Sequence, residues 1–252
     1  MKPIDYPVWF KIVSVATVLL FALNVGFVAV PVHAFFVRAI PLISGHDLLV
    51  GLGTVAASFF GAAFAFVFAW YQRRRERIAE NVTGGNRALF TLGTMRNVLE
   101  QYRKEFVEPS RGMADAWLNF NLGPPLPTNL SFDVKDLSFL MSRGAGGTFQ
   151  QLMLEEERYR LVAFAVAEHR RLILEEAWPR MEAAGMSLGD KRPEQDVVKI
   201  VGPGTSQQLK VTVESLTRNV DENLKSTKEV FSRLQTVLKK VYPRESFINF
   251  SF

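Results

Sequence analysis

The longest uninterrupted apolar stretch of the chain runs from Leu48 to Tyr71 and contains no charged residue. A helix needs about 20 apolar residues to cross a hydrocarbon core of roughly 30 Å, so the pattern predicts a membrane span over residues 48–71. The stretch closes on Trp70 and Tyr71, an aromatic pair typical of the membrane–water interface. A basic collar follows directly, made of Arg73, Arg74, Arg75 and Arg77. Because basic flanks stay on the cytoplasmic side, we expect the remainder of the chain to be cytoplasmic.

A second apolar run covers residues 12–32 and predicts another transmembrane helix before the first. A cleaved signal peptide is the alternative, because Lys2 and Lys11 are positive and Val32-His33-Ala34 resembles a cleavage site. The run is longer than the usual 7–15 residues of a signal sequence, which favours a span. Two spans give a hairpin with both termini inside, and we expect it in a bacterial inner (plasma) membrane.

Small residues recur every four positions along the second predicted span, at Gly53, Ala57, Gly61 and Ala65. In lipid, such a ridge lets two helix backbones approach closely and associate by packing. Ala22 and Gly26 repeat the spacing once on the first run, and Asn24 between them requires a hydrogen-bond partner inside a bundle. The ridge therefore predicts either a contact between copies of the chain or the packing of the two spans within one chain.

The cytoplasmic part begins with an amphipathic helix, whose apolar positions from Ala88 to Phe106 follow a period near 3.6. Gly84 and Gly85 precede it and predict a hinge, or a helix end followed by a new start, because each glycine weakens a helix by roughly 1 kcal/mol. Residues 110–131 read as a loop with three prolines, in which Trp117 and Phe120 are expected to enter the core. Residues 133–141 predict a short helix capped by Ser131 or Asp133.

Two long helices are predicted over residues 148–184 and 210–241, and an antiparallel pair is their simplest assembly. The second has apolar residues in alternating steps of three and four, close to a coiled-coil heptad. Between them, Val197–Val201 resembles a short strand, and the tail 246–252 is expected to pair with it or to fill a groove. The predicted fold class is all-α: a membrane domain, residues 1–77, with a two-span hairpin, and a cytoplasmic helical bundle, residues 78–252.

The basic character of the chain is concentrated in the collar. The formal net charge is +5, from 30 basic and 25 acidic residues. Residues 73–77 alone contribute +3, and residues 78–252 contribute only +1. A collar of this kind attracts anionic lipid head groups at roughly 1 kcal/mol per basic residue. Nucleic-acid binding needs a basic stripe on the folded domain, so we expect the lipid bilayer as a partner and no nucleic acid.

Candidate chemistry is sparse in this sequence. The absence of cysteine excludes disulfides, thiol catalysis and cysteine-based metal sites. His169 is the one histidine after Arg77, and it falls on the apolar stripe of the helix 148–184, which favours a packing role over catalysis. The glycine clusters at 84–85 and 144–147 do not have the strand–loop–Lys pattern of a phosphate loop. We therefore predict no catalytic residue, no metal site and no cofactor.

These features favour a non-enzymatic integral membrane protein whose cytoplasmic helices mediate protein interaction or sensing, and which forms homo-oligomers or binds a protein partner. The architecture is also like that of two-span effectors of bacterial defence systems, so an oligomeric channel or pore-forming effector is the alternative. Ion pathways usually contain ionisable residues, and neither predicted span has one, which favours the first hypothesis.

Overall fold

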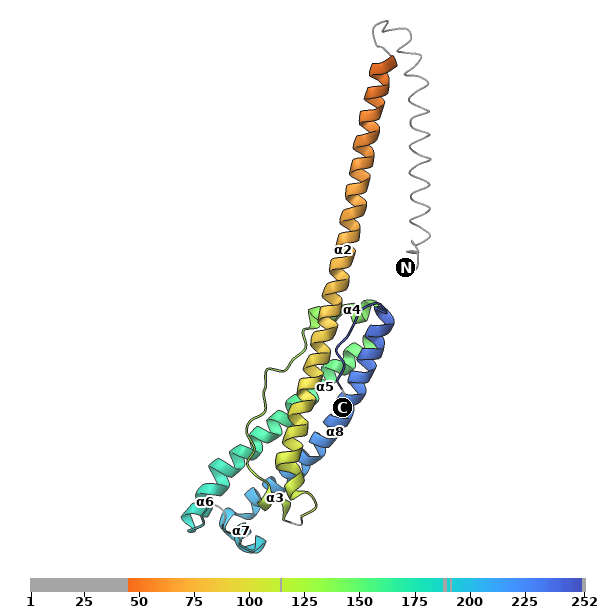
Figure 1. The fold of residues 1–252 in the computed structure, drawn as a ribbon. Helices are drawn as coiled ribbons and strands as arrows, with labels where there is room; N and C mark the ends of the chain where they lie inside the picture. Colours follow the sequence, from red (N-terminus) through yellow and green to blue (C-terminus); the bar gives the residue numbers. More distant parts are fainter. Residues whose placement is uncertain (1–44, 114, 188–189, 191, 251–252) are drawn as a thin grey trace. The chain divides into compact units, whose positions relative to one another are not determined.

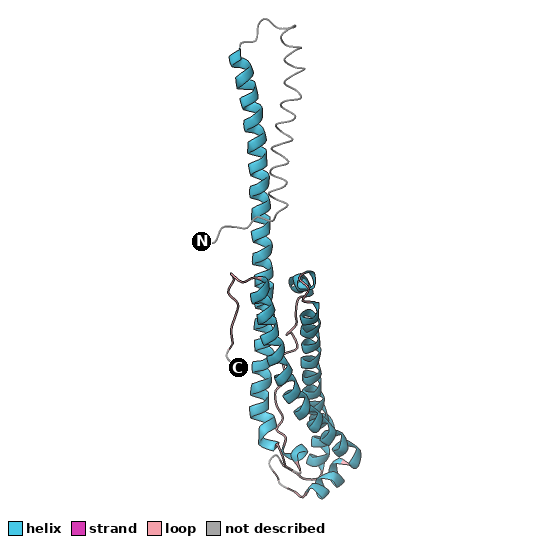
Figure 2. Cartoon of the chain, turned by 90° about the vertical axis from the view of Figure 1, so that its right-hand side faces the viewer, coloured by secondary structure: helices cyan, strands magenta, loops and turns pink. Residues whose placement is uncertain are grey.

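The computed structural model of the chain describes residues 45–113, 115–187, 190 and 192–250. These residues form helices and loops without a strand (Figure 2), which confirms the all-helical class for this part of the chain. Two compact units divide after Tyr71: Met1–Tyr71 and Gln72–Phe252. The run 12–32, including Ala22, Asn24 and Gly26, lies outside the described residues, so the two-span hairpin stays a prediction.

The helix α2 (Gly45–Tyr102) supplies the described part of the first unit and continues into the second (Figure 1). A π-helical turn, η1 (Arg103–Val107), and a 3₁₀ turn, η2 (Glu108–Ser110), follow it. The short helices α3 (Ala116–Asn119) and α4 (Val134–Ser142) come next. The Asp133 carboxylate caps α4 by accepting from the Lys135 N–H at 2.8 Å, which confirms the predicted cap.

The predicted helix 148–184 is present as α5 (Gly146–Arg171), a π-helical turn η3 (Leu172–Ala177) and α6 (Trp178–Ala183). Both π-helical turns precede a proline, Pro109 or Pro179, which has no N–H to donate and cannot follow a regular helical turn without a clash. The helix therefore widens before Pro179 and continues to Ala183.

The helix α8 (Pro203–Val241) packs antiparallel to α5, as predicted. Arg233 near the end of α8 donates to Gln151 near the start of α5 at 2.6 Å, and Thr205 at the other end donates to Glu176 at 3.2 Å. Between α6 and α8 lies α7 (Glu194–Val201), so the strand predicted at Val197–Val201 is wrong. The valines and the isoleucine of this segment favoured a strand in the sequence. Glu194 and Asp196 in the first turn favour a helix instead, because they lie at the positive end of the helix dipole.

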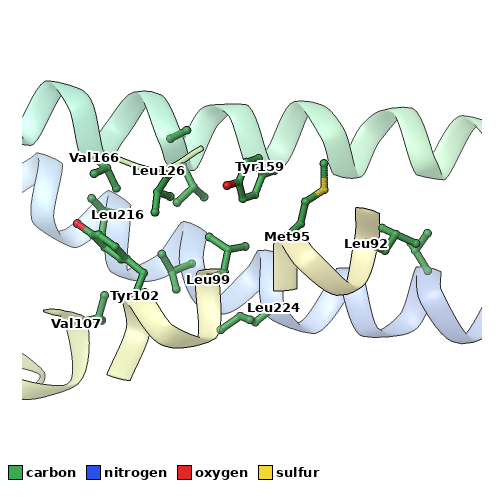
Figure 3. Close-up of a cluster of buried hydrophobic side chains, with 14 of the residues drawn as sticks. Leu92, Met95, Leu99, Tyr102, Val107, Leu126, Tyr159, Val166, Leu216 and Leu224 are labelled. Atoms are coloured by element: carbon green, nitrogen blue, oxygen red, sulfur yellow. The ribbon is translucent and has the colours of Figure 1, made fainter. Parts of the chain in front are cut away.

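One hydrophobic core joins α2, α5 and α8 (Figure 3). Met95, Leu99 and Tyr102 of α2 point toward Tyr159 and Val166 of α5 and toward Leu216 and Leu224 of α8, and all seven are buried. Trp117 and Phe120 are buried as well, which confirms their predicted place in the core. The tail passes close to α2, because Ile248 N–H donates to Asn86 Oδ1 at 2.9 Å. It therefore fills a groove and forms no edge with residues 197–201.

Candidate functional site

The described residues offer three surfaces on which function can be argued: the apolar segment of α2, the basic collar and the end of the bundle next to the collar. Most described side chains of the apolar segment, residues 50–71, are exposed, and Phe64, Phe66 and Phe68 are 72%, 74% and 67% exposed. Its most hydrophobic window is 0% buried. Among the described residues, one helix, α2, is long and apolar enough to cross a membrane, judged by its length and composition. A helix surface that is apolar all round is suited to lipid.

The predicted ridge of small residues lies open on this segment. Gly53, Ala57, Gly61 and Ala65 are exposed, and a Cβ added at Gly53 or Gly61 would meet no atom within 4 Å. Two nearby hydroxyls are satisfied within the helix, since Thr54 donates to the Val50 carbonyl and Ser58 to the Thr54 carbonyl, both at 2.9 Å. The ridge can accept another helix, and the association of two helices there stays a prediction.

The collar residues Arg73, Arg74, Arg75 and Arg77 are exposed and belong to the second unit. Arg77 Nε donates to the Arg73 carbonyl at 3.4 Å, which holds this side chain along the helix. The collar follows directly on Tyr71, which is 47% exposed. The order of apolar segment, aromatic pair and basic collar thus lies on the surface of a single helix, as the sequence predicts.

The helix does not end at Gly84 and Gly85, so the predicted break is wrong, and a hinge there stays a prediction. Both glycines are buried in a close helix contact. A Cβ on Gly84 would collide with the Asp136 carbonyl oxygen of α4, and a Cβ on Gly85 would lie 2.7 Å from Leu238 Cδ2 of α8. Glycine is required here because α4 and α8 approach the backbone of α2.

A cavity of about 430 Å³ opens beside this contact, between α2, the segment 131–133, α4 and the tail. Arg87 Nη1 and Asp136 Oδ2 form an ion pair across it at 2.6 Å, and Phe90, which is 58% exposed, lines it together with Ile248. The ion pair is exposed, so it contributes at most about 1 kcal/mol. The cavity has no group of reactive side chains.

A polar group lies inside the bundle at Glu155, which is 1% exposed. Its carboxylate accepts from the hydroxyls of Ser226 at 2.7 Å and Thr227 at 3.2 Å, and it pairs with Arg158 Nη1 at 2.6 Å. These bonds link α5 to α8. Thr227 also lies 2.9 Å from Asn223 Oδ1, so the Glu155 carboxylate is occupied by contacts that hold the helix pair together.

His169 is 1% exposed, and its ring lies 5.0 Å from Phe120 in an edge-on contact. Burial, with a smaller effect from the neighbouring Arg170 charge, lowers the pKa of His169 to about 4. The imidazole is therefore neutral at pH 7 and is shielded from solvent. This surrounding fits the packing role predicted from the sequence.

No group of three or more His, Cys, Asp or Glu side chains among the described residues is arranged to hold a metal ion. Comparisons with protein-family models, with curated proteins and with solved structures found no match for this chain. Any functional conclusion therefore rests on the three surfaces themselves.

The structure also assembles a group that the sequence reading did not identify. Lys135 and Arg143 of the α4 region come together with Lys239, Lys240 and Arg244 at the end of α8, because Phe139 contacts Tyr242 with ring centres 5.9 Å apart. The two segments are about 100 residues apart in the sequence. No local pattern indicates their meeting, since it depends on how α4 packs on α8.

Proposed function

We propose that this chain is an integral membrane protein that holds a helical interaction domain on the cytoplasmic side of a bacterial inner membrane. The observation that carries the proposal is the surface of α2, where an uncovered apolar segment, residues 50–71, is followed at once by the arginine collar. In water, such a segment would expose a continuous apolar surface far larger than soluble proteins tolerate. In a bilayer, the same segment is solvated by lipid, and the collar fixes its direction.

The domain after the collar is suited to binding by its surfaces. Its long helices, α5 and α8, are held together by the buried Glu155 network, which leaves their outer faces available to a partner. On α5, Leu161 and Phe164 are 60% and 68% exposed on neighbouring turns. Exposed apolar side chains of this kind favour contact with a second protein or a second copy of the chain.

The ridge of α2 is the proposed contact for self-association in the membrane. Gly53 and Gly61 have open space around them, so a second helix can approach the backbone closely there. A channel is the weaker alternative, because residues 50–71 contain no charged side chain, whereas ion pathways usually contain some.

The first experiment is the mass of the full chain extracted from native membranes in mild detergent, with its co-purifying proteins identified. The variant Gly53→Leu/Ala57→Leu/Gly61→Leu is compared with the matched control Gly51→Leu/Ala62→Leu, whose positions lie away from the ridge. We expect the ridge variant alone to lower the oligomer mass, by weakening association about 10-fold or more.

Two results contradict the proposal. If alkaline carbonate extracts the wild-type chain from membranes, it is not an integral membrane protein. If the ridge variant and the control retain the same mass, the ridge is not a contact between chains. A second protein present in fixed proportion with the wild type would identify the chain as an anchor or receptor for that partner.

A further inference from the structure

The end of the second unit next to the collar gathers positive charge from three separate parts of the chain. Its residues lie in three segments: 73–87 of α2, 133–143 around α4, and 239–245 at the end of α8. We call this region the collar end. It contains ten basic and five acidic residues, a net charge of +5, of which the collar supplies +3. The rest of residues 72–252 contains 17 basic and 18 acidic residues, a net charge of −1.

Contacts within the second unit hold these segments at one height along α2. Asn81 Nδ2 donates to the Tyr242 hydroxyl at 2.8 Å, and a Cβ added at Gly85 or Gly84 would meet Leu238 or Asp136. Figure 1 shows α4 and the end of α8 at the same end of the helical bundle. Gly85 lies eight residues after Arg77, which is about 12 Å along a helix. This distance is about one and a half times the Debye length of about 8 Å at physiological ionic strength, so the field of an anionic surface at Arg77 is largely screened at Gly85. The cations of this end therefore act on lipid only by approaching the head groups directly.

The basic side chains of the collar end are exposed and can contact an anionic ligand. Lys135, Arg143, Lys239, Lys240 and Arg244 are all exposed, and none of them forms an ion pair with another described residue. Elsewhere in the unit many arginines are paired, for example Arg111 with Asp221 at 2.9 Å and Arg171 with Glu168 at 2.8 Å. Exposed cations without an ion pair to another described residue also occur elsewhere in the unit, for example Arg218, Lys225 and Lys228, so the collar end is distinguished by its net charge of +5.

The outer face of α4 adds an apolar contribution at the same end. Val134 and Met141 are each 51% exposed and lie seven residues apart, which places them on one face of the helix with Ser138 between them. Lys135 is the next residue after Val134, and Arg143 follows the end of α4. Apolar side chains bordered by basic ones are typical of helices that lie in the head-group layer of a membrane.

We propose that the collar end is a second membrane contact, in which α4 and the end of α8 dock on anionic lipid head groups. Val134 and Met141 enter the head-group layer, and the five cations bind lipid phosphates. This inference rests on the proposed membrane anchoring by α2 and goes beyond it, because it gives the helical domain its own lipid-dependent docking. The α8 cations also stabilise the negative end of their helix, so the test must measure lipid contact and not stability alone.

The chain contains no cysteine, so a single introduced cysteine carries a unique fluorescent probe. We place it by Ser138→Cys in the full chain, reconstituted in vesicles of phosphatidylcholine with or without phosphatidylglycerol, and measure quenching by brominated lipids. The control probe is Ser187→Cys, an exposed position between α6 and α7. We expect quenching at position 138 only in vesicles with phosphatidylglycerol, and none at position 187.

The variant Lys239→Gln/Lys240→Gln/Arg244→Gln should lower the docking equilibrium on the order of 100-fold, since three cations are lost. A probe at 138 that stays unquenched in both lipids, or is quenched equally in both, overturns the proposal. Carbonate extraction of the same vesicles distinguishes the proposed membrane anchoring by α2 from the proposed docking of the collar end. A chain that remains in the membrane but shows no docking refutes the second contact alone.

Discussion

The apolar segment 50–71 and the helical domain 72–252 place their side chains in opposite ways. In the segment, Phe64 and Phe66 are more than 70% exposed, and in the domain the polar Glu155 and His169 are 1% exposed. The first arrangement suits a helix whose surroundings are apolar, such as lipid or another helix. The second is stable only when each buried polar group is paired or neutral. The comparison shows that the two regions differ in the kind of side chain they expose and the kind they bury.

The strongest test of this difference places charge on the apolar segment. The variant Phe60→Asp/Phe64→Asp should lose membrane integration, because each aspartate near the middle of a span costs about 2.5–3.5 kcal/mol. The measurement is the fraction of chain that remains in the pellet after alkaline extraction. Phe164→Asp is the matched control, since Phe164 is 68% exposed on the domain. That change should alter the unfolding free energy by less than about 0.5 kcal/mol. If both variants leave the same fraction of chain in the pellet, the apolar segment does not differ from the domain in its need for an apolar surrounding.

The second test acidifies the domain. Its folded state keeps the pKa of His169 at about 4, below the ordinary value of 6.5. Between pH 6.5 and 4 the unfolded chain binds a proton that the folded chain does not, so stability falls as pH decreases through this window. The loss should approach about 3 kcal/mol at pH 4 and level off below it. Denaturant unfolding of the wild type and of His169→Gln gives the difference. Parallel pH profiles for the two proteins would contradict the prediction.

The smallest expected effect compares glycines on the two parts of α2. Gly84→Ala should destabilise the domain by roughly 1–3 kcal/mol, because the new methyl group collides with the Asp136 carbonyl of α4. Gly53→Ala has open space around it and should leave the unfolding transition of the domain unchanged. Thermal unfolding in detergent measures both. If Gly84→Ala is as stable as the wild type, the close contact of α2 with α4 is not required.

Periodicity was sufficient to predict the helical core. The 3.6-residue pattern from Ala88 onward identified Leu89, Leu92, Met95 and Leu99, and all are buried. The antiparallel pairing of α5 and α8 followed from two long apolar stripes and one loop. The apolar surface of residues 50–71 and the basic collar after it were also predictable from the sequence, because both depend only on local composition.

Most features that the sequence did not predict depend on contacts between residues that are far apart along the chain. Gly84 and Gly85 suggested a break because the atoms that require glycine there, in Asp136 and Leu238, are far away in sequence. The basic group at the collar end was missed for the same reason. Val197–Val201 was read as a strand from its β-branched residues, whereas its burial against α8 and its acidic first turn support a helix.

The contact between α2 and the tail sets an order of events during synthesis. Ile248 N–H donates to Asn86, Gly93 lies against Phe250, and Asn81 donates to Tyr242, so α2 completes its packing with residues made about 160 positions later. At roughly 5–20 residues per second, a ribosome needs about 8–30 s to supply them. Throughout that interval the part of α2 around Asn81, Asn86 and Gly93 lacks its contacts with the C-terminal tail. A nascent chain stalled before residue 238 lacks these contacts and should therefore be a better substrate for chaperones and proteases than the full chain.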